Sequence, residues 1–264
     1  MKPSTTSLRK KSLYTLFAVV FWLIIWQLAS MFIAQEILLV SPVAVIEKLF
    51  FLVRENSFWQ AISLSLGHIS LGFLLGLLFG CLLAVCSSFS PFIRQLLSPL
   101  MMTIKSVPVA SFVILALFWF SSYHLSIFIS FLMVFPVIYA NVLTGFLETD
   151  VKLLEMASVF QVSFGKKIRY IYLSQVLPFF RTGCSLALGL CWKAGIAAEV
   201  IGIPKGFIGE KLYEAKIYLE TADLLAWTVV IVFLSLLFEK IVLWFVDGLV
   251  RRLEGRHFFG YKNR

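Results

Sequence analysis

Four ionisable side chains lie inside long apolar segments of this sequence, namely His68, Lys105, Lys193 and Glu199. Lys105 lies near the end of its segment and can extend its amino group to the membrane surface, whereas the other three each need a specific role. A charged group is costly in hydrocarbon, so such residues usually face a polar pathway or a partner. Lys193 could face a pathway and favour an anionic solute, or it could form a buried ion pair. We expect Glu199 to anchor a helix end or a gate, and His68 to donate a hydrogen bond between helices.

No pattern typical of catalysis or metal binding accompanies these residues. The three histidines, at positions 68, 124 and 257, are scattered, and the four cysteines form no Cys-x-x-Cys pair. Neither a metal site nor a disulfide is therefore expected. The sequence has no nucleophile–base pair and no phosphate-binding Gly-x-x-x-x-Gly-Lys-Ser/Thr loop. We expect a protein that is not an enzyme and that binds no metal, cofactor or nucleotide itself.

The composition is that of a membrane protein. Of 264 residues, 60% are hydrophobic and only 14% are charged, and the mean hydropathy is +0.94; soluble domains are far more polar. A net charge of +9 could indicate nucleic-acid binding, but the basic residues cluster at the ends of apolar segments. That distribution is typical of membrane topology signals. We expect an all-α protein that crosses the lipid several times and binds no nucleic acid.

Apolar segments of about 20 residues predict six transmembrane helices. They cover about 13–33, 61–85, 99–120, 125–146, 179–201 and 224–246. The first is predicted to be a retained helix, because no small-x-small cleavage site follows it. Pro108 should kink or break the third. The chain then divides into an N-terminal tail, first helix and connector (1–54), a core of five helices (55–250) with a loop at 147–178, and a basic tail (251–264).

Two sets of small residues predict close packing between helices. In the second helix, Gly72, Gly76 and Gly80 repeat every four residues, and Gly183, Ala187 and Gly195 repeat similarly in the fifth. Small side chains at this spacing let a neighbouring helix approach closely in a membrane.

The loop between the fourth and fifth helices is amphipathic. On a helix, Leu153, Met156, Ala157 and Phe160 fall on one face and Glu155 falls opposite. Such a segment could lie on the lipid surface or dock a soluble partner.

The positive charges decide on which side this loop lies. With six helices, the basic residues of the N-terminal tail, Arg94, the 152–169 segment and the C-terminal tail fall on one side of the membrane. The positive-inside rule places that side, with both termini, in the cytoplasm. The loop would then be accessible to a cytoplasmic partner.

These features resemble the permease subunits of bacterial binding-protein-dependent ABC importers. In that family a cytoplasmic loop reads roughly Glu-Ala-Ala, three residues and Gly, and later Leu-Pro; this chain has Glu155-Met156-Ala157 and Leu177-Pro178. The run from Trp192 to Gly202, which contains Ala197-Ala198-Glu199, is similar to the nitrate/sulfonate/taurine branch in particular. Gln161 stands where the family has glycine. We therefore expect a docking helix at about 150–162 and the break after it at Gly165, so that this helix runs about one turn longer than is usual.

The resemblance implies a division of labour. Two copies of the permease would form the pathway, and two cytoplasmic ATPase subunits, which bind ATP and Mg, would each receive one coupling helix. An external binding protein would deliver a small solute, and the location would be the bacterial inner membrane. The implied docking residues are Leu153, Glu155, Met156, Ala157, Phe160, Gln161, Gly165 and Pro178. Two alternatives remain, the transmembrane subunit of an energy-coupling vitamin importer and a secondary transporter.

Overall fold

The computed structural model describes residues 5–33, 35 and 37–254, and all regular secondary structure within these ranges is helical. The prediction of an all-α chain is thus confirmed. Most of the predicted basic tail, from residue 255 onward, lies outside the described residues. The chain divides into two compact units, one combining the chain up to Gln60 with Lys211–Ile231, the other combining Ala61–Glu210 with the chain from Val232.

The first unit contains α1 (Thr5–Ile33), α2 (Pro42–Leu52), most of α10 (Ile208–Ile217) and the start of α11 (Thr221–Glu254). Ser41 caps α2 by accepting a hydrogen bond from the Ala44 amide, and Pro42 provides a favourable first helical residue. Lys48 of α2 forms an ion pair with Asp223 of α11 at 2.8 Å. Helices α2 and α10 lie in segments that were expected to be connectors, and α2 is largely apolar, with Val43, Ile46 and Phe50 exposed.

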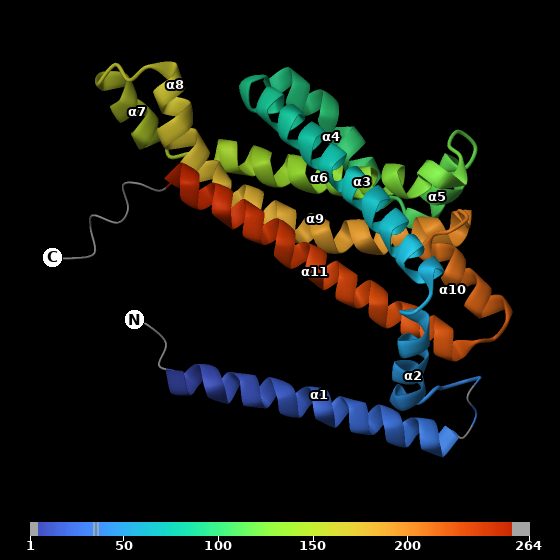
Figure 1. Ribbon diagram of the computed structural model, residues 1–264. Helices are drawn as coiled ribbons and strands as arrows, with labels where there is room; N and C mark the ends of the chain where they lie inside the picture. Colours follow the sequence, from blue (N-terminus) through green and yellow to red (C-terminus); the bar gives the residue numbers. More distant parts are fainter. Residues whose placement is uncertain (1–4, 34, 36, 255–264) are drawn as a thin grey trace. The chain divides into compact units, whose positions relative to one another are not determined.

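The second unit carries the remaining helices. It contains most of α3 (Asn56–Phe89), followed by α4 (Pro91–Ser106), α5 (Val109–Ala116), α6 (Ser122–Leu147), α7 (Val151–Val159), α8 (Phe164–Lys167), a π-helical turn (Ile168–Tyr172) and α9 (Leu173–Gly202). Helices α7 and α8 lie at one end of the α6–α9 pair, and the turn at 203–207 lies at the other (Figure 1).

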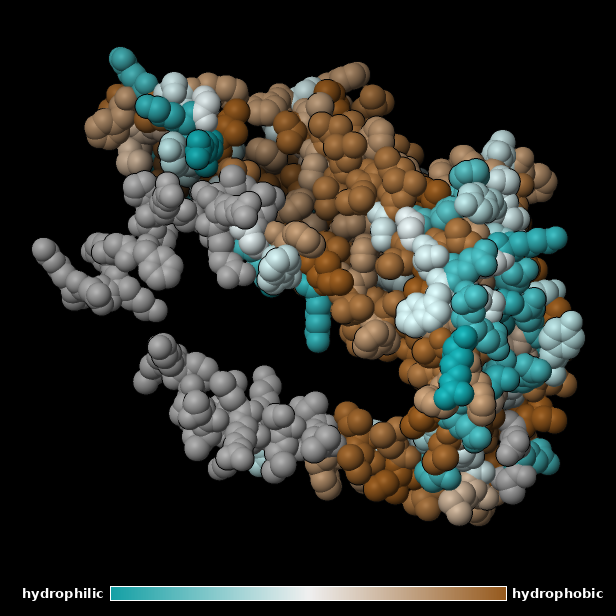
Figure 2. Space-filling model, viewed as in Figure 1, coloured by the Kyte–Doolittle hydropathy of each residue, from teal (hydrophilic) through white to brown (hydrophobic). Residues whose placement is uncertain are grey.

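Four helices are long and apolar enough to cross a membrane, namely α3, α6, the continuous Phe164–Gly202 helix and the Thr221–Gly248 part of α11. A broad apolar surface covers α3 and α4 (Figure 2). The third predicted segment differs from expectation, since it begins earlier, at Pro91, and consists of α4 and α5 bent by 102° at a break that contains Pro108. The first predicted segment corresponds to a shorter apolar stretch, Phe17–Ile33 of α1. The protein is a multi-pass membrane protein.

Helix α6 packs against both α3 and α9 at backbone contact distance. A Cβ atom at Gly76 would lie 2.7 Å from Cβ of Val134, and one at Gly80 would lie 2.9 Å from Cβ of Ile138. From α9, a Cβ at Gly183 would lie 2.9 Å from Cβ of Asn141 of α6. Real Cβ atoms do not approach so closely, so these positions of α3 and α9 require glycine as long as the helices keep this spacing.

The packing predicts that two glycine-to-alanine substitutions in α3 change the stability of the protein differently. Gly76→Ala forces α3 and α6 apart and should destabilise the protein by about 1–3 kcal/mol, the usual cost of overpacking. Gly67→Ala should be neutral or slightly stabilising, because nothing lies within 4 Å of a Cβ at that position. Thermal unfolding of the purified variants in one detergent measures both effects. Equal melting temperatures for the two variants would contradict the close contact.

Candidate functional site

The loop between α6 and α9 contains a short, well-capped helix. Asp150 begins α7 by accepting a hydrogen bond from the Lys152 amide at 2.9 Å. At the other end, the Val162 amide bonds to the Ala157 carbonyl at 2.9 Å and the Gln161 amide to the Ser158 carbonyl at 3.0 Å. This pair of bonds is a Schellman motif, which places Gln161 in the left-handed conformation with φ of 49°.

The position of the break corrects the expectation from the sequence. The break falls at Gln161 and not at Gly165, and α7 ends at Val159, so the helix is shorter than predicted. Glutamine adopts the left-handed region at a cost of about 1–2 kcal/mol, which the Schellman hydrogen bonds offset. Gly165 lies inside α8 with no positive φ, and a Cβ there would meet nothing within 4 Å.

Exposed apolar side chains cover α7 and the start of α8. We call this set, formed by Val151, Met156, Val159, Phe160 and Phe164, the α7 surface; Val159 is 80% exposed and Phe160 is 75% exposed. Glu155 is also exposed and Leu153 is half-buried, whereas Ala157 is buried and faces inward. Exposed apolar patches mark interaction sites. The sequence did not predict Val159 as a docking residue, because on a helical projection it lies next to, and not on, the face formed by Leu153, Met156 and Phe160.

Glu199 holds the opposite end of the unit together. Its Oε2 accepts hydrogen bonds from Ser65 Oγ of α3 at 2.7 Å and from the Gly209 amide of α10 at 3.3 Å. Ser65 Oγ also accepts from the Ile208 amide at 3.1 Å. We call this junction of α3, α9 and the start of α10, formed by Ser65, Glu199 and the 208–209 amides, the Glu199 clasp. A carboxylate at a helix N-terminus is favourable because free amides and the helix dipole meet it there.

This arrangement requires glycine at position 209, because a Cβ atom there would overlap the Cβ and the carbonyl carbon of Glu199. Glu199 is fully buried, and its Oε1 has no hydrogen-bond partner among the described residues. Ser126 of α6 lies beside the same carboxyl group. Ser65 was missed in the sequence because a serine in an apolar helix carries no signal for a partner 134 residues away.

His68 lies next to the clasp, but its hydrogen bond differs from expectation. Its Nδ1 pairs with the Leu64 carbonyl at 2.9 Å, within α3, so the predicted bond between helices is not formed there. Instead, the His68 ring contacts the rings of Tyr123 and Phe207 edge-on, each at 4.8 Å between centroids. Phe207 is fully buried, so the 203–207 turn inserts an aromatic side chain between α3 and α6.

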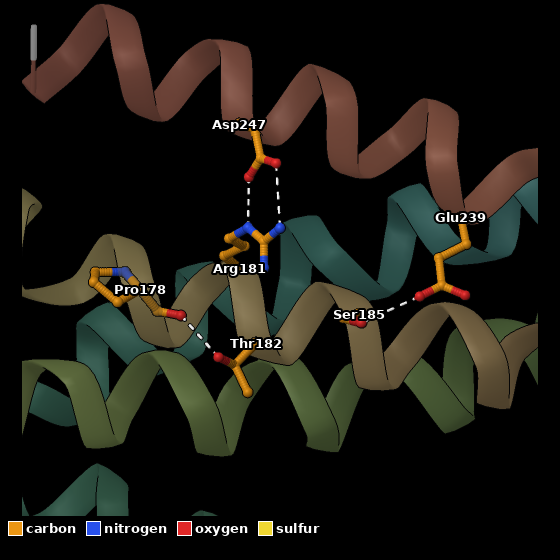
Figure 3. Close-up of polar contacts among 6 residues, drawn as sticks. All are labelled: Pro178, Arg181, Thr182, Ser185, Glu239 and Asp247. Atoms are coloured by element: carbon orange, nitrogen blue, oxygen red, sulfur yellow. Dashed lines mark hydrogen bonds and ion pairs between the residues drawn. The ribbon is translucent and has the colours of Figure 1, made fainter. Parts of the chain in front are cut away.

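Charged and polar side chains also join α9 to α11. Arg181 forms a bidentate ion pair with Asp247, and Ser185 donates to Glu239 at 3.2 Å. Both residues of α9 point towards α11, whereas Thr182 lies on another side of α9 and donates to the Pro178 carbonyl at 3.0 Å (Figure 3). Asp247 and Glu239 were not predicted from the sequence as functional residues. Acidic residues in an apolar helix nevertheless predict basic or hydroxyl partners on a neighbouring helix.

Lys193 takes part in none of the ion pairs among the described side chains. Its side chain is exposed, and the ion pairs among the described side chains are Lys48–Asp223, Arg181–Asp247 and Lys211–Glu214. Towards the other end of α9, an open groove of about 420 Å³ is lined by Ala140, Asn141, Thr144, Pro178, Phe179 and Thr182. The structure thus brings neither Lys193 nor His68 into direct contact with Glu199.

The clasp predicts a difference between two substitutions of Glu199. Glu199→Ala leaves the Gly209 amide and the Ser65 hydroxyl without their acceptor, and each unsatisfied buried group costs about 1–3 kcal/mol. Glu199→Gln keeps an acceptor oxygen and should stay within about 1 kcal/mol of the wild type. Chemical or thermal unfolding in detergent distinguishes them. Equal destabilisation by both substitutions would show that the hydrogen bonds do not hold the clasp.

Comparisons with known proteins give the same family for most of the chain. Residues 72–255 match the family described as binding-protein-dependent transport system inner membrane component. The chain is 27% identical over 233 residues, 87% of this chain and 81% of the relative, to the putative aliphatic sulfonates transport permease protein SsuC of Bacillus subtilis (strain 168). It is 27% identical over 220 residues, 81% of this chain and 80% of the relative, to the taurine transport system permease protein TauC of Escherichia coli (strain K12).

A third relative is the bicarbonate transport system permease protein CmpB of Synechococcus elongatus, 26% identical over 200 residues that cover 75% of this chain and 72% of the relative. All three relatives are transport permeases and not enzymes. The family match covers well over half of the chain, and the polar loop, the glycine-packed helices and the Ala-Ala-Glu run all lie within it. The chain therefore belongs to the binding-protein-dependent transport system inner membrane components, as an ABC importer permease of the nitrate/sulfonate/taurine branch.

Proposed function

We propose that this chain is the transmembrane subunit of an importer in which two copies form the pathway for a small solute. Two cytoplasmic ATPase subunits bind ATP and Mg and drive uptake, and an external binding protein delivers the solute. The observation that carries this proposal is the α7 surface, an exposed apolar patch on the loop between two membrane-spanning helices. Such a patch favours a protein partner on that side of the membrane.

Six spans are proposed for each copy, formed by the apolar part of α1, α3, the bent α4–α5 pair, α6, the Phe164–Gly202 helix and α11. An even number of spans puts both termini on one side. The basic residues of the N-terminal tail, of the α7–α8 loop and of the chain end assign that side to the cytoplasm. The Glu199 clasp then lies near the external face, and α7 lies in the cytoplasm.

The connections of α7 suit the transmission of movement. Only Glu148–Asp150 separate α7 from α6, and this link is tied back to α6 by the Glu148 amide to Thr144 carbonyl bond at 2.8 Å and by Thr149 Oγ1, which donates to the Gly145 carbonyl at 3.2 Å. On the other side, α8 continues through the π-helical turn into α9 without a break. Helices α6 and α9 pack closely along each other. An ATPase that moves α7 would therefore move α6 and α9 together.

The relatives suggest the class of solute. The names of these relatives specify aliphatic sulfonates, taurine and bicarbonate. Sulfonate and bicarbonate groups are anionic at neutral pH. We propose a small anion, or a zwitterion with a sulfonate-like group, as the solute of this importer.

The α7 surface predicts which substitution separates the ATPase from the permease. Phe160→Asp places a charge in the centre of the docking patch and should reduce the amount of ATPase subunit that co-purifies with the chain from its native membranes at least tenfold. A charge buried in an apolar contact costs several kcal/mol, so partial retention is not expected.

The matched control for this experiment is Ile217→Asp, at the end of α10, which is also an exposed apolar position, 56% exposed. In the proposed topology Ile217 lies on the external side, so this variant should keep its ATPase. Retention of the ATPase by Phe160→Asp, or its loss from both variants, would contradict docking through α7.

A further inference from the structure

We infer that one face of α9, formed by Thr182, Gly189 and Lys193, lines the solute pathway, and that Lys193 gives this pathway a preference for anions. We call these three residues the α9 pathway face. The inference rests on the proposed importer function and adds to it the part of the chain that meets the solute.

The three residues share one side of the helix. At 100° per residue, Lys193 lies about 20° around the helix from Thr182, and Gly189 precedes Lys193 by one turn. All three positions are open in the structure: Thr182 and Lys193 are exposed, and a Cβ at Gly189 would meet nothing within 4 Å. By contrast, Gly183, about 100° around the helix from Thr182, is packed against α6, and Gly195 is packed against Ile69 of α3 and Ser130 of α6.

Lys193 is poorly suited to a position facing lipid. It lies nine residues before the end of α9 at Gly202, about 13 Å along the axis, which is farther than a lysine side chain of about 6 Å can reach. None of the ion pairs among the described side chains neutralises its charge. A lysine this deep in a span that has no ion pair requires water or an anion next to it.

Thr182 extends the α9 pathway face to the open groove of about 420 Å³, which it lines together with Asn141 and Thr144 of α6. Leu186, 55% exposed, lies between Thr182 and Lys193 on this side of the helix, so the face also contains an apolar position. On α11, Val232, Phe233 and Leu236 are all more than half exposed and apolar, and we assign that surface to lipid.

The chemistry of the face fits an anion that passes without being trapped. A lysine ammonium carries one positive charge and three N–H donors, and sulfonate or bicarbonate oxygens are acceptors. A single cation attracts an anion weakly enough to release it, as a pathway requires. The face carries no carboxylate that would favour a cation.

The test measures how fast a cysteine reacts with thiol reagents of opposite charge. The sample is the full-length chain with its native partners in membrane vesicles. All variants also carry Cys86→Ser, which removes the exposed native cysteine. Gly189→Cys places a thiol one turn from Lys193. We expect this thiol to react with both sulfonatoethyl and trimethylammonioethyl methanethiosulfonate. The anionic-to-cationic ratio of reaction rates should fall about fivefold when Lys193→Gln is added, because a unit charge at about 6 Å in water changes each rate a few-fold in opposite directions.

Two variants serve as controls. Lys193→Arg keeps the charge and should keep the rate ratio, and Phe233→Cys on the lipid-facing side of α11 should react with neither reagent. If Gly189→Cys reacts no faster than Phe233→Cys, the face does not line water and the inference fails. If Gly189→Cys reacts but Lys193→Gln leaves the ratio unchanged, Lys193 does not set the charge preference. Neither result depends on ATPase docking, so failure here is distinguishable from failure of the proposed importer function.

Discussion

The close approach of α6 to α3 and α9 is the contact on which the rest of this structure depends. In lipid the hydrophobic effect does not drive helices together, so their association depends on van der Waals packing. Small residues strengthen this packing because they let the two backbones come into contact. Gly76 and Gly80 of α3 meet α6, Gly183 of α9 meets Asn141 of α6, and Gly195 of α9 meets both Ile69 of α3 and Ser130 of α6. The two helices that flank α7 therefore form one packed block with α3.

The two ends of α9 are held by different chemistry, and its middle is left open on one face. The Glu199 clasp fixes the end at Gly202 to α3 and α10, while Arg181 and Ser185 bond to α11 near the end that carries α8. Between these anchors, Lys193 and the space over Gly189 remain free. A helix that is fixed at both ends and connected to α7 can carry movement along its length and still line a pathway.

The sequence was sufficient for the apolar helices, because hydropathy over 61–85, 125–146, 179–201 and 224–246 reports directly on burial in lipid. It was also sufficient for the break at Pro108. It failed for α2 and α10, which have 11 and 10 residues and are too short to register as membrane spans. It also failed at Gln161, where hydrogen bonds of the Schellman motif stabilise a conformation that residue type alone argues against. The Glu199 clasp joins residues far apart in the chain, and no local pattern reports such a contact.

The central claim is that α6 and α9 move as one body when an ATPase displaces α7. A disulfide between them tests this directly, since a Cβ at Gly145 would lie 3.2 Å from Cβ of Phe179, next to the loop that carries α7. In Gly145→Cys/Phe179→Cys permease assembled with its ATPase and binding protein, oxidation should leave the stimulation of ATP hydrolysis by the binding protein within about twofold of the reduced and single-cysteine forms. Loss of that stimulation on oxidation, with recovery on reduction, would mean that α6 and α9 must slide past each other, and would contradict the claim.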